Sequence, residues 1–397
     1  MTAREPTQTA ERGDAAGEST LKLYIDSTSL PLVHQMADFV ACADKPEVVK
    51  LITWLRLPLS EKQLAGSNAL YVQQMAAISP AFVAGVCDLV RRNRFRRVEI
   101  HSNQFHSWRG VAPLLRALVP LLPDIRDVVR LHLYDDGSIG LLHREDLKAH
   151  ADPGRLIDDA AQDLRVHVFD GKPLRWGVPQ SYAWHHLFET RYHLLRRDVL
   201  LRDASGRALY DYLEPLTSDL RFDGMPHLTD AQQQRYLRLF GLNAEVAESL
   251  NTAPGRTSML FTGTGVWDKK DNRVLCDSVL KAIEQLRANG CIPPDWRLFY
   301  KGHPVSADHD ARLMQALGDD VTALPSHVPL EVLMMAGLLP TRLAGVMSSS
   351  HLTLPSERIA YLLCRSSATQ SAPEAALVRL MLDAGIVSPE RMLPLMD

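Results

Sequence analysis

The sequence lacks the features that mark disulfide-rich, membrane-spanning and nucleic-acid-binding proteins. Its five cysteines are odd in number, lie far apart and form no CxxC pair, so we expect free thiols rather than a disulfide framework or a zinc site. No apolar run is long enough to span a bilayer. The formal net charge of −3 provides no positive field that would favour nucleic acid or an anionic membrane surface.

Signatures of several enzyme classes are also absent. The chain has no GxGxxG fingerprint, no Walker lysine, and no GxSxG, HExxH or kinase motif, which disfavours the families that depend on them. Residues 1–19 hold almost no large apolar side chain. We therefore expect a disordered leader without a secretory h-region and a cytoplasmic protein, either free or resting on the inner membrane.

The 397 residues are enough for two domains, and strand-like runs alternate with helix-like segments along the whole chain. Such alternation predicts mostly parallel sheets covered by helices. Two α/β halves of similar size favour two Rossmann-like domains facing across a cleft, which is the GT-B arrangement. One large doubly wound domain with a helical insert is the alternative.

A stretch rich in aromatic residues and prolines, at about 166–190, is interpreted as the transition between the domains. The predicted first domain comprises residues 20–190 together with 370–397, which cross back to it. The predicted second domain comprises residues 191–369.

Polar residues follow several of the expected strands, where ligands of α/β proteins bind. An apolar run from Leu298 ends at Lys301 and His303, which suit an anion and a proton transfer near neutral pH. Asp135 and Asp136 follow another strand, and their repulsion raises the proton affinity of at least one carboxylate. This pair fits a general base, a metal ligand or an Asp-Gly turn.

Two loops offer hydrogen-bond donors for a phosphate, namely residues 262–265 (Thr-Gly-Thr-Gly) and 348–350 (three serines). Glu331, near the start of a short predicted helix, suits either ribose hydroxyls or the helix dipole. Residues 308–310 (Asp-His-Asp) mimic a DxD metal motif. Because they precede a predicted helix, we interpret them as structural.

Several short motifs occur in a specific order. The first half contains Leu23-Tyr-Ile-Asp26 with Ser29-Leu-Pro31, Ile100-His101 with Asn103 and His106-Ser107, and Leu133-Tyr-Asp-Asp-Gly-Ser138. The second half contains Phe261-Thr-Gly-Thr264 with Trp267, Tyr300-Lys-Gly-His-Pro304, Glu331-Val-Leu-Met-Met335 with Gly337-Leu-Leu-Pro340, and Gly345-Val346 with Ser348-Ser349. In this order and spacing the chain resembles the bacterial sialyltransferases of glycosyltransferase family 80, and most of all their multifunctional Pasteurella type.

The resemblance implies transfer of sialic acid from CMP-N-acetylneuraminic acid to a terminal galactoside hydroxyl of an oligosaccharide or glycolipid. It further implies inversion, no required metal or other cofactor, an α2,3 linkage rather than α2,6, and room for a donor-hydrolase or sialidase side activity. It assigns Asp136 as the base and His303 as the acid. It also assigns donor-binding residues (Gly263, Thr264, Lys301, Glu331, Ser348, Ser349 and Ser29) and acceptor-binding residues (Trp267, His106 and Ser138).

Two other functions remain open at this point. One is a transferase for a different CMP-activated nonulosonate. The other is a glycan- or nucleotide-binding relative with little turnover, against which the retained Asp136 and His303 argue. A metal-dependent transferase would be recognised by loss of activity in EDTA.

Overall fold

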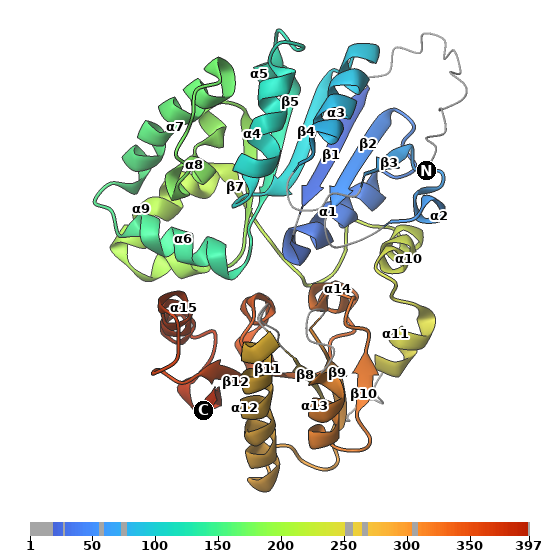
Figure 1. Ribbon diagram of the computed structural model, residues 1–397, viewed down its shortest axis with the longest axis vertical. Coiled ribbons are helices and arrows are strands. Elements are labelled where there is room, and N and C mark those ends of the chain that lie inside the picture. Colours follow the sequence, from blue (N-terminus) through green and yellow to red (C-terminus); the bar gives the residue numbers. More distant parts are fainter. Residues whose placement is uncertain are drawn as a thin grey trace.

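The computed structural model contains two parallel β-sheets, one above the other in Figure 1, with helices packed around each. It describes residues 19–26, 28–54, 59–72, 78–250, 257–263, 269–303 and 309–395. The first half of the chain forms the upper part, coloured blue to green, and the second half forms the lower part, coloured brown to red. No helix in these ranges is both long and apolar enough to cross a membrane.

The first sheet has seven parallel strands in the order β3-β2-β1-β4-β5-β6-β7. Parallel neighbours require crossover connections, which the helices of this half provide. The strands are β1 (Thr20–Asp26), β2 (Val48–Trp54), β3 (Ala69–Tyr71), β4 (Arg97–Asn103), β5 (Val129–Tyr134), β6 (Glu189–Leu194) and β7 (Thr217–Asp219). The helices are α1 (Ser29–Ala41), α2 (Glu61–Leu64), α3 (Pro80–Arg92), α4 (Ser107–Leu118), α5 (Ile125–Val128), α6 (Ser138–Lys148), α7 (Pro153–Asp170), α8 (Val178–Tyr182) and α9 (Ala204–Leu213), with 3-10 turns η1 (Trp184–His186), η2 (Arg197–Arg202) and η3 (Glu214–Leu216).

The second sheet has six parallel strands in the order β10-β9-β8-β11-β12-β13. The strands are β8 (Ser258–Thr262), β9 (Arg297–Lys301), β10 (Thr322–Leu324), β11 (Arg342–Val346), β12 (Ile359–Arg365) and β13 (Met392–Leu395). The helices are α10 (Asp230–Leu239), α11 (Ala244–Leu250), α12 (Lys269–Ala288), α13 (Asp310–Leu317), α14 (Leu330–Met335) and α15 (Ala372–Asp383), with 3-10 turns η5 (Ser349–Thr353), η6 (Ser356–Arg358) and η7 (Pro389–Arg391). The predicted α/β class with two Rossmann-like halves is therefore confirmed.

Three apolar clusters hold this architecture together. One cluster lies between the first sheet and α3, α4 and α7, and another joins the second sheet to α12 and α13. The third is shared by the two halves, because it contains buried side chains from α1 and from α10, α14 and α15. Burial of apolar surface between the halves therefore holds the two sheets against each other.

The division of the chain differs from the prediction in two places. Strands β6 and β7 pair in the first sheet, so the first half extends to Asp219 rather than to residue 190. The aromatic stretch is not a transition, because Tyr182, Trp184 and Phe188 are buried in the core of that half. At the other end β13 pairs with β12 in the second sheet, although α15 does pack against α6 of the first half.

Candidate active site

The loops that follow the strands of the two sheets meet at the junction of the halves. Ser138, after β5, and Ser349, after β11, have their hydroxyl oxygens 3.3 Å apart, although 211 residues separate them. Gly137 makes this approach possible, since its φ is +65° and an added Cβ would lie 2.7 Å from the Cβ of Ser349. The structure thus brings together two of the predicted site residues from opposite halves.

The two adjacent aspartates occupy different environments. Asp135 is fully buried and forms an ion pair with Arg144, with 2.7 Å between Oδ2 and Nη1. The backbone N–H of Leu195 also donates to this oxygen, at 3.0 Å. Gly140 leaves room for the pair, because a Cβ there would collide with the Asp135 carboxylate. Asp135 is therefore a structural residue of the first half.

Asp136 is half-buried and forms no ion pair with a lysine or arginine among the described residues. Burial raises the pKa of its carboxyl above the ordinary value, while hydrogen bonds with Asn103 and Thr28 and the nearby His106 oppose that increase. The side-chain amide of Asn103 also donates to the Thr28 hydroxyl, at 2.8 Å. A carboxylate that is desolvated yet held by fixed donors has the properties of a general base.

His106 lies close enough to Asp136 for their charges to interact. Burial lowers the pKa of His106, against the opposing effect of Asp136. Its Nδ1 is buried and has no hydrogen-bond partner among the described residues. The backbone N–H of His106 donates to Asn103 Oδ1 at 3.1 Å, which fixes the loop. His106 thus places a buried ring nitrogen beside Asp136 with no hydrogen-bond partner among the described residues.

Glu331 and Lys301 form the polar part of the site in the second half. Glu331 is 4% exposed, and its Oε1 accepts a hydrogen bond from the Ser350 hydroxyl at 2.7 Å. Lys301, at the end of β9, donates to the carbonyl of Ser326 at 3.1 Å. Burial lowers the pKa of Lys301, whereas the carboxylates of Glu331 and Asp310 raise it. Glu331 is therefore tied through Oε1 to the serine loop that follows β11.

Ser348 is held by a buried histidine. The Nδ1 of His351 lies 3.2 Å from the backbone N of Ser348 and 3.1 Å from its Oγ. Burial lowers the pKa of His351 to about 4, so the ring is neutral at pH 7. In a neutral imidazole only one ring nitrogen is an acceptor, and it has a single lone pair to share between two donors. When the backbone N–H of Ser348 uses that lone pair, the hydroxyl becomes free to donate to an anion.

The loop after β9 carries the predicted acid, His303, two residues beyond Lys301. The backbone N–H of Gly263, after the neighbouring β8, donates to the carbonyl of Lys301 at 2.9 Å. The two strand ends thus place Gly263 and His303 on adjacent loops. Asp310 is the first residue of α13 and accepts a hydrogen bond from the Tyr300 hydroxyl at 2.8 Å, in keeping with a structural role.

Three of the predicted site residues stand apart from these contacts. Ser29 is the first residue of α1, next to Thr28 and hence near the Asp136 side. Thr264 and Trp267 lie outside the described residues. Their assignments to the donor and the acceptor therefore remain predictions.

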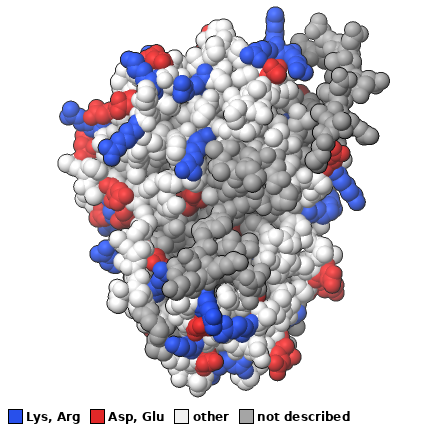
Figure 2. Space-filling model, in the orientation of Figure 1, with Lys and Arg blue, Asp and Glu red and all other residues white. Residues whose placement is uncertain are grey.

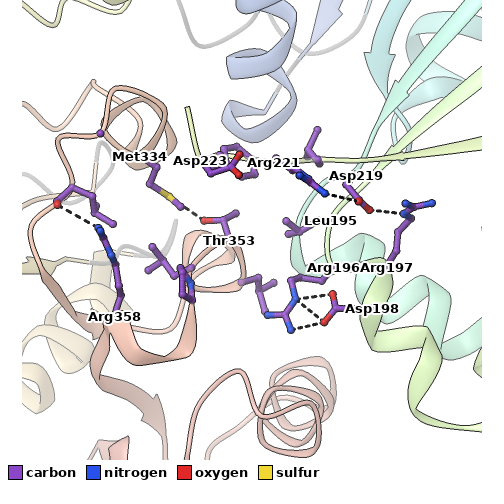
Figure 3. A pocket seen from close by; sticks show the side chains of 17 residues that line it. Leu195, Arg196, Arg197, Asp198, Asp219, Arg221, Asp223, Met334, Thr353 and Arg358 are labelled. Carbon is purple, nitrogen blue, oxygen red and sulfur yellow. Dashed lines mark hydrogen bonds and ion pairs between the residues drawn. The ribbon is translucent and has the colours of Figure 1, made fainter. Parts of the chain in front are cut away.

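A separate cavity of about 600 Å³ lies beside the site, also at the junction. It is lined by residues 195–198 and 219–223 of the first half and by parts of α14, η5 and η6 of the second half. Figure 3 shows that Arg196 is paired with Asp198 and Arg197 with Asp219, both within the part of the lining that the first half provides. None of the predicted site residues lines it.

Figure 2 shows basic and acidic side chains interspersed on one face of the molecule, without a large area of one sign.

Several site residues had no assigned role in the sequence interpretation. Thr28 and Asn103 hold Asp136, and only Asn103 lay within a recognised motif. Arg144 neutralises Asp135, and His351 holds Ser348, but neither has a signature in the sequence. Their partners become visible only when helices and loops fold back onto the strand ends.

Two parallel sheets facing each other, with polar loops at their junction, form the GT-B arrangement, which glycosyltransferases share. A family model described as Sialyltransferase PMO188 matches residues 21–384, so the chain belongs to this sialyltransferase family. The predicted family and the enzyme class are confirmed. No curated protein matches the chain by sequence.

Solved structures share this fold. The GT-B domain of a Photobacterium damselae sialyltransferase is 26% identical, with a TM-score of 0.83 over 94% of this chain and 99% of that one. A Photobacterium 2,6-sialyltransferase, solved with CMP and lactose, shares the fold at 24% identity and a TM-score of 0.83, over 96% of this chain and 79% of that one. A Photobacterium phosphoreum α-2,3-sialyltransferase also shares the fold, at 20% identity and a TM-score of 0.80, over 96% of this chain and 99% of that one.

The adjacent aspartates should respond differently to the same substitution. Asp135→Asn leaves the buried Arg144 guanidinium without its counter-charge, so we expect a loss of about 3–5 kcal/mol in the free energy of unfolding. Asp136→Asn removes a carboxylate that burial already disfavours, so stability should change little while transferase activity falls. Urea denaturation and activity assays of both variants check this. Equal destabilisation would contradict the assignment.

The hydrogen bond from Asn103 should set the pH dependence of the reaction. The base must be ionised, so kcat/KM is expected to rise with pH through the raised pKa of Asp136. Asn103→Ala removes a contact that lowers this pKa, so the acidic limb of the profile should move to higher pH. The exposed Asn93→Ala variant is the matched control and should leave the limb in place. An unmoved limb in Asn103→Ala would refute this account.

Proposed function

We propose that the enzyme transfers N-acetylneuraminic acid from its CMP ester to a hydroxyl of a terminal galactose, with inversion and without a metal. The observation that carries this proposal is the meeting of Ser138 and Ser349. It sets the half-buried Asp136 of one half beside the serine loop of the other. Membership of the sialyltransferase family supports the transferred sugar. The related Photobacterium enzyme solved with CMP and lactose supports the nucleotide and a galactoside acceptor.

Asp136 is proposed to act on the acceptor. Its carboxylate accepts the proton of the acceptor hydroxyl as that oxygen attacks the anomeric carbon. The raised pKa favours this transfer, because the base is then a stronger proton acceptor at neutral pH. Attack from the side of the first half, with CMP leaving toward the second half, gives inversion at that carbon. His106, whose Nδ1 is buried, is proposed to bind the acceptor sugar.

The second half is proposed to stabilise the leaving group. Departure of CMP produces an oxocarbenium-like sugar and leaves negative charge on the phosphate, which fixed donors stabilise. The hydroxyls of Ser348 and Ser349 supply such donors, and His303 supplies the proton. Glu331 accepts the ribose hydroxyls with the oxygen that Ser350 leaves unused. Lys301, whose ammonium interacts with the Glu331 carboxylate, is proposed to supply positive charge on this side of the site in place of a metal.

The remaining details of the proposal follow the family resemblance. We favour the α2,3 linkage over α2,6, and an oligosaccharide or glycolipid acceptor reached in the cytoplasm or at the inner membrane. Gly263, Thr264 and Ser29 are assigned to the donor, and Trp267 and Ser138 to the acceptor. Because the base lies on one half and the leaving-group residues lie on the other, the two halves must come together for turnover. This limits hydrolysis of the donor, which is the expected side activity.

Product analysis tests this proposal. With CMP-N-acetylneuraminic acid and lactose in EDTA, the wild type should form α2,3-sialyllactose. Asp136→Ala and His303→Ala should each lower kcat/KM by about 10²–10⁴-fold, since each removes a proton-transfer group. Asp211→Ala and His327→Ala, which alter exposed residues of the same types, should keep wild-type rates.

Each other outcome has a distinct meaning. CMP release without sialyllactose would reject lactose as acceptor, and no CMP release would reject this donor in favour of another CMP-activated nonulosonate. Activity lost in EDTA and restored by a divalent cation would reject the metal-independent mechanism. Sialyllactose with an α2,6 bond would overturn the linkage alone.

A further inference from the structure

An apolar groove lies between the N-terminal parts of α3 and α4, two helices that pack against each other beside the first sheet (Figure 1). The groove has a volume of about 560 Å³ and is lined by Pro80, Val83 and Ala84 of α3 and by Trp108 and Pro113 of α4. Both helices begin on the side of the sheet where the parallel strands end. The groove therefore lies near the edge of the sheet that carries the site.

Trp108 is the largest side chain in the lining of this groove, and it is not covered by the fold. Its side chain is 38% exposed, although tryptophan is a residue that folding usually buries. The guanidinium carbon of Arg109 lies 4.6 Å from the centroid of the Trp108 ring and still leaves this area in contact with solvent. An exposed indole among other apolar side chains is typical of a binding surface.

The first turn of α4 connects this groove to the acceptor side of the site. The carbonyl of His106 accepts hydrogen bonds from the backbone N–H groups of Arg109, at 2.9 Å, and of Gly110, at 3.2 Å. A Cβ at Gly110 would lie 3.1 Å from Ile25 of β1, so this turn packs closely against the sheet. His106 and Trp108 are therefore held in one helical turn, whose pitch is about 5.4 Å.

The lining determines which kind of ligand suits the groove. Among the described residues that line it, Arg109 is the only charged one, and none has a carboxylate, hydroxyl or amide side chain. Besides burial, the charge of Arg109 lowers the pKa of His106, which places the guanidinium toward the acceptor side. Sugar hydroxyls would find few hydrogen-bond partners in such a groove, whereas a hydrocarbon group would bury apolar surface there.

We propose that this groove binds the apolar aglycone of a galactoside acceptor. The inference rests on the proposed function, because it takes a galactose bound beside His106 and Asp136. A terminal galactose carries the rest of the acceptor on its anomeric oxygen, and the groove is the apolar surface in the same helical turn as His106. An alkyl or aryl aglycone, as in a glycolipid, is therefore recognised by Trp108 and by the side chains of α3.

The groove affects binding of the acceptor and takes no part in proton transfer or sugar transfer. An aglycone makes the same apolar contacts in the ground state and in the transition state. Such uniform binding lowers KM and leaves kcat unchanged. The groove volume lies within the range of about 300–1,000 Å³ that small-molecule sites have, which is enough for an alkyl chain of several carbons.

Calorimetric titration of the full-length protein with octyl β-lactoside and with methyl β-lactoside, both with CMP present, tests the groove. The octyl compound should bind at least about tenfold more tightly, since each buried methylene favours binding about fourfold. Assays with CMP-N-acetylneuraminic acid should show the same preference in KM, with an unchanged kcat. If neither lactoside is sialylated, the proposed function is rejected, and the calorimetric preference still decides whether the groove binds an aglycone.

Two substitutions locate the preference in the groove. Trp108→Ala should weaken binding of octyl β-lactoside by at least about tenfold and leave methyl β-lactoside unaffected. Ala84→Glu places a charge against the chain from an exposed position of α3, and it should have the same effect if Trp108→Ala folds poorly. Leu201→Ala is the matched control, because this side chain is 37% exposed and lies outside the groove. Equal binding of the two lactosides by the wild type, a preference that survives both substitutions, or an equal loss in Leu201→Ala would overturn the proposal.

Discussion

The approach of the Ser349 loop to Gly137 is the contact on which the arrangement of the site depends. A side chain at Gly137 would push the two loops apart, and its positive φ turns the chain directly after Asp136. The apolar cluster shared by α1, α10, α14 and α15 holds the halves in the position where this contact forms. The site is therefore a property of the interface between the halves, and neither sheet contains it alone.

The two adjacent aspartates have different electrostatic environments and therefore different roles. Asp135 is neutralised by Arg144 and helps to hold the fold, whereas burial of Asp136 raises its pKa. On the other half, the neutral His351 holds both the backbone N–H and the hydroxyl of Ser348 through its Nδ1. In each case a buried partner fixes one group so that its neighbour can act on a ligand.

Much of this structure could be predicted from local sequence, and the rest depends on long-range pairing. Ser79 caps α3 and Thr229 caps α10, and such caps can be recognised from a few neighbouring residues. Strand ends followed by polar loops also located the regions around Asp136 and Lys301. By contrast, the sheet to which β6 and β13 belong, and the partner of Asp135, are set by contacts across the fold. Local patterns carry no information on these contacts.

The central claim is that donor and base occupy opposite halves of one junction. A crystal structure with CMP and lactose tests it most directly. We expect the ribose on Glu331, the phosphate at Ser348 and Ser349, and a galactose hydroxyl about 2.6–3.2 Å from the Asp136 carboxylate. CMP bound in the neighbouring arginine-lined cavity, or a galactose hydroxyl held by groups other than Asp136, would contradict the account.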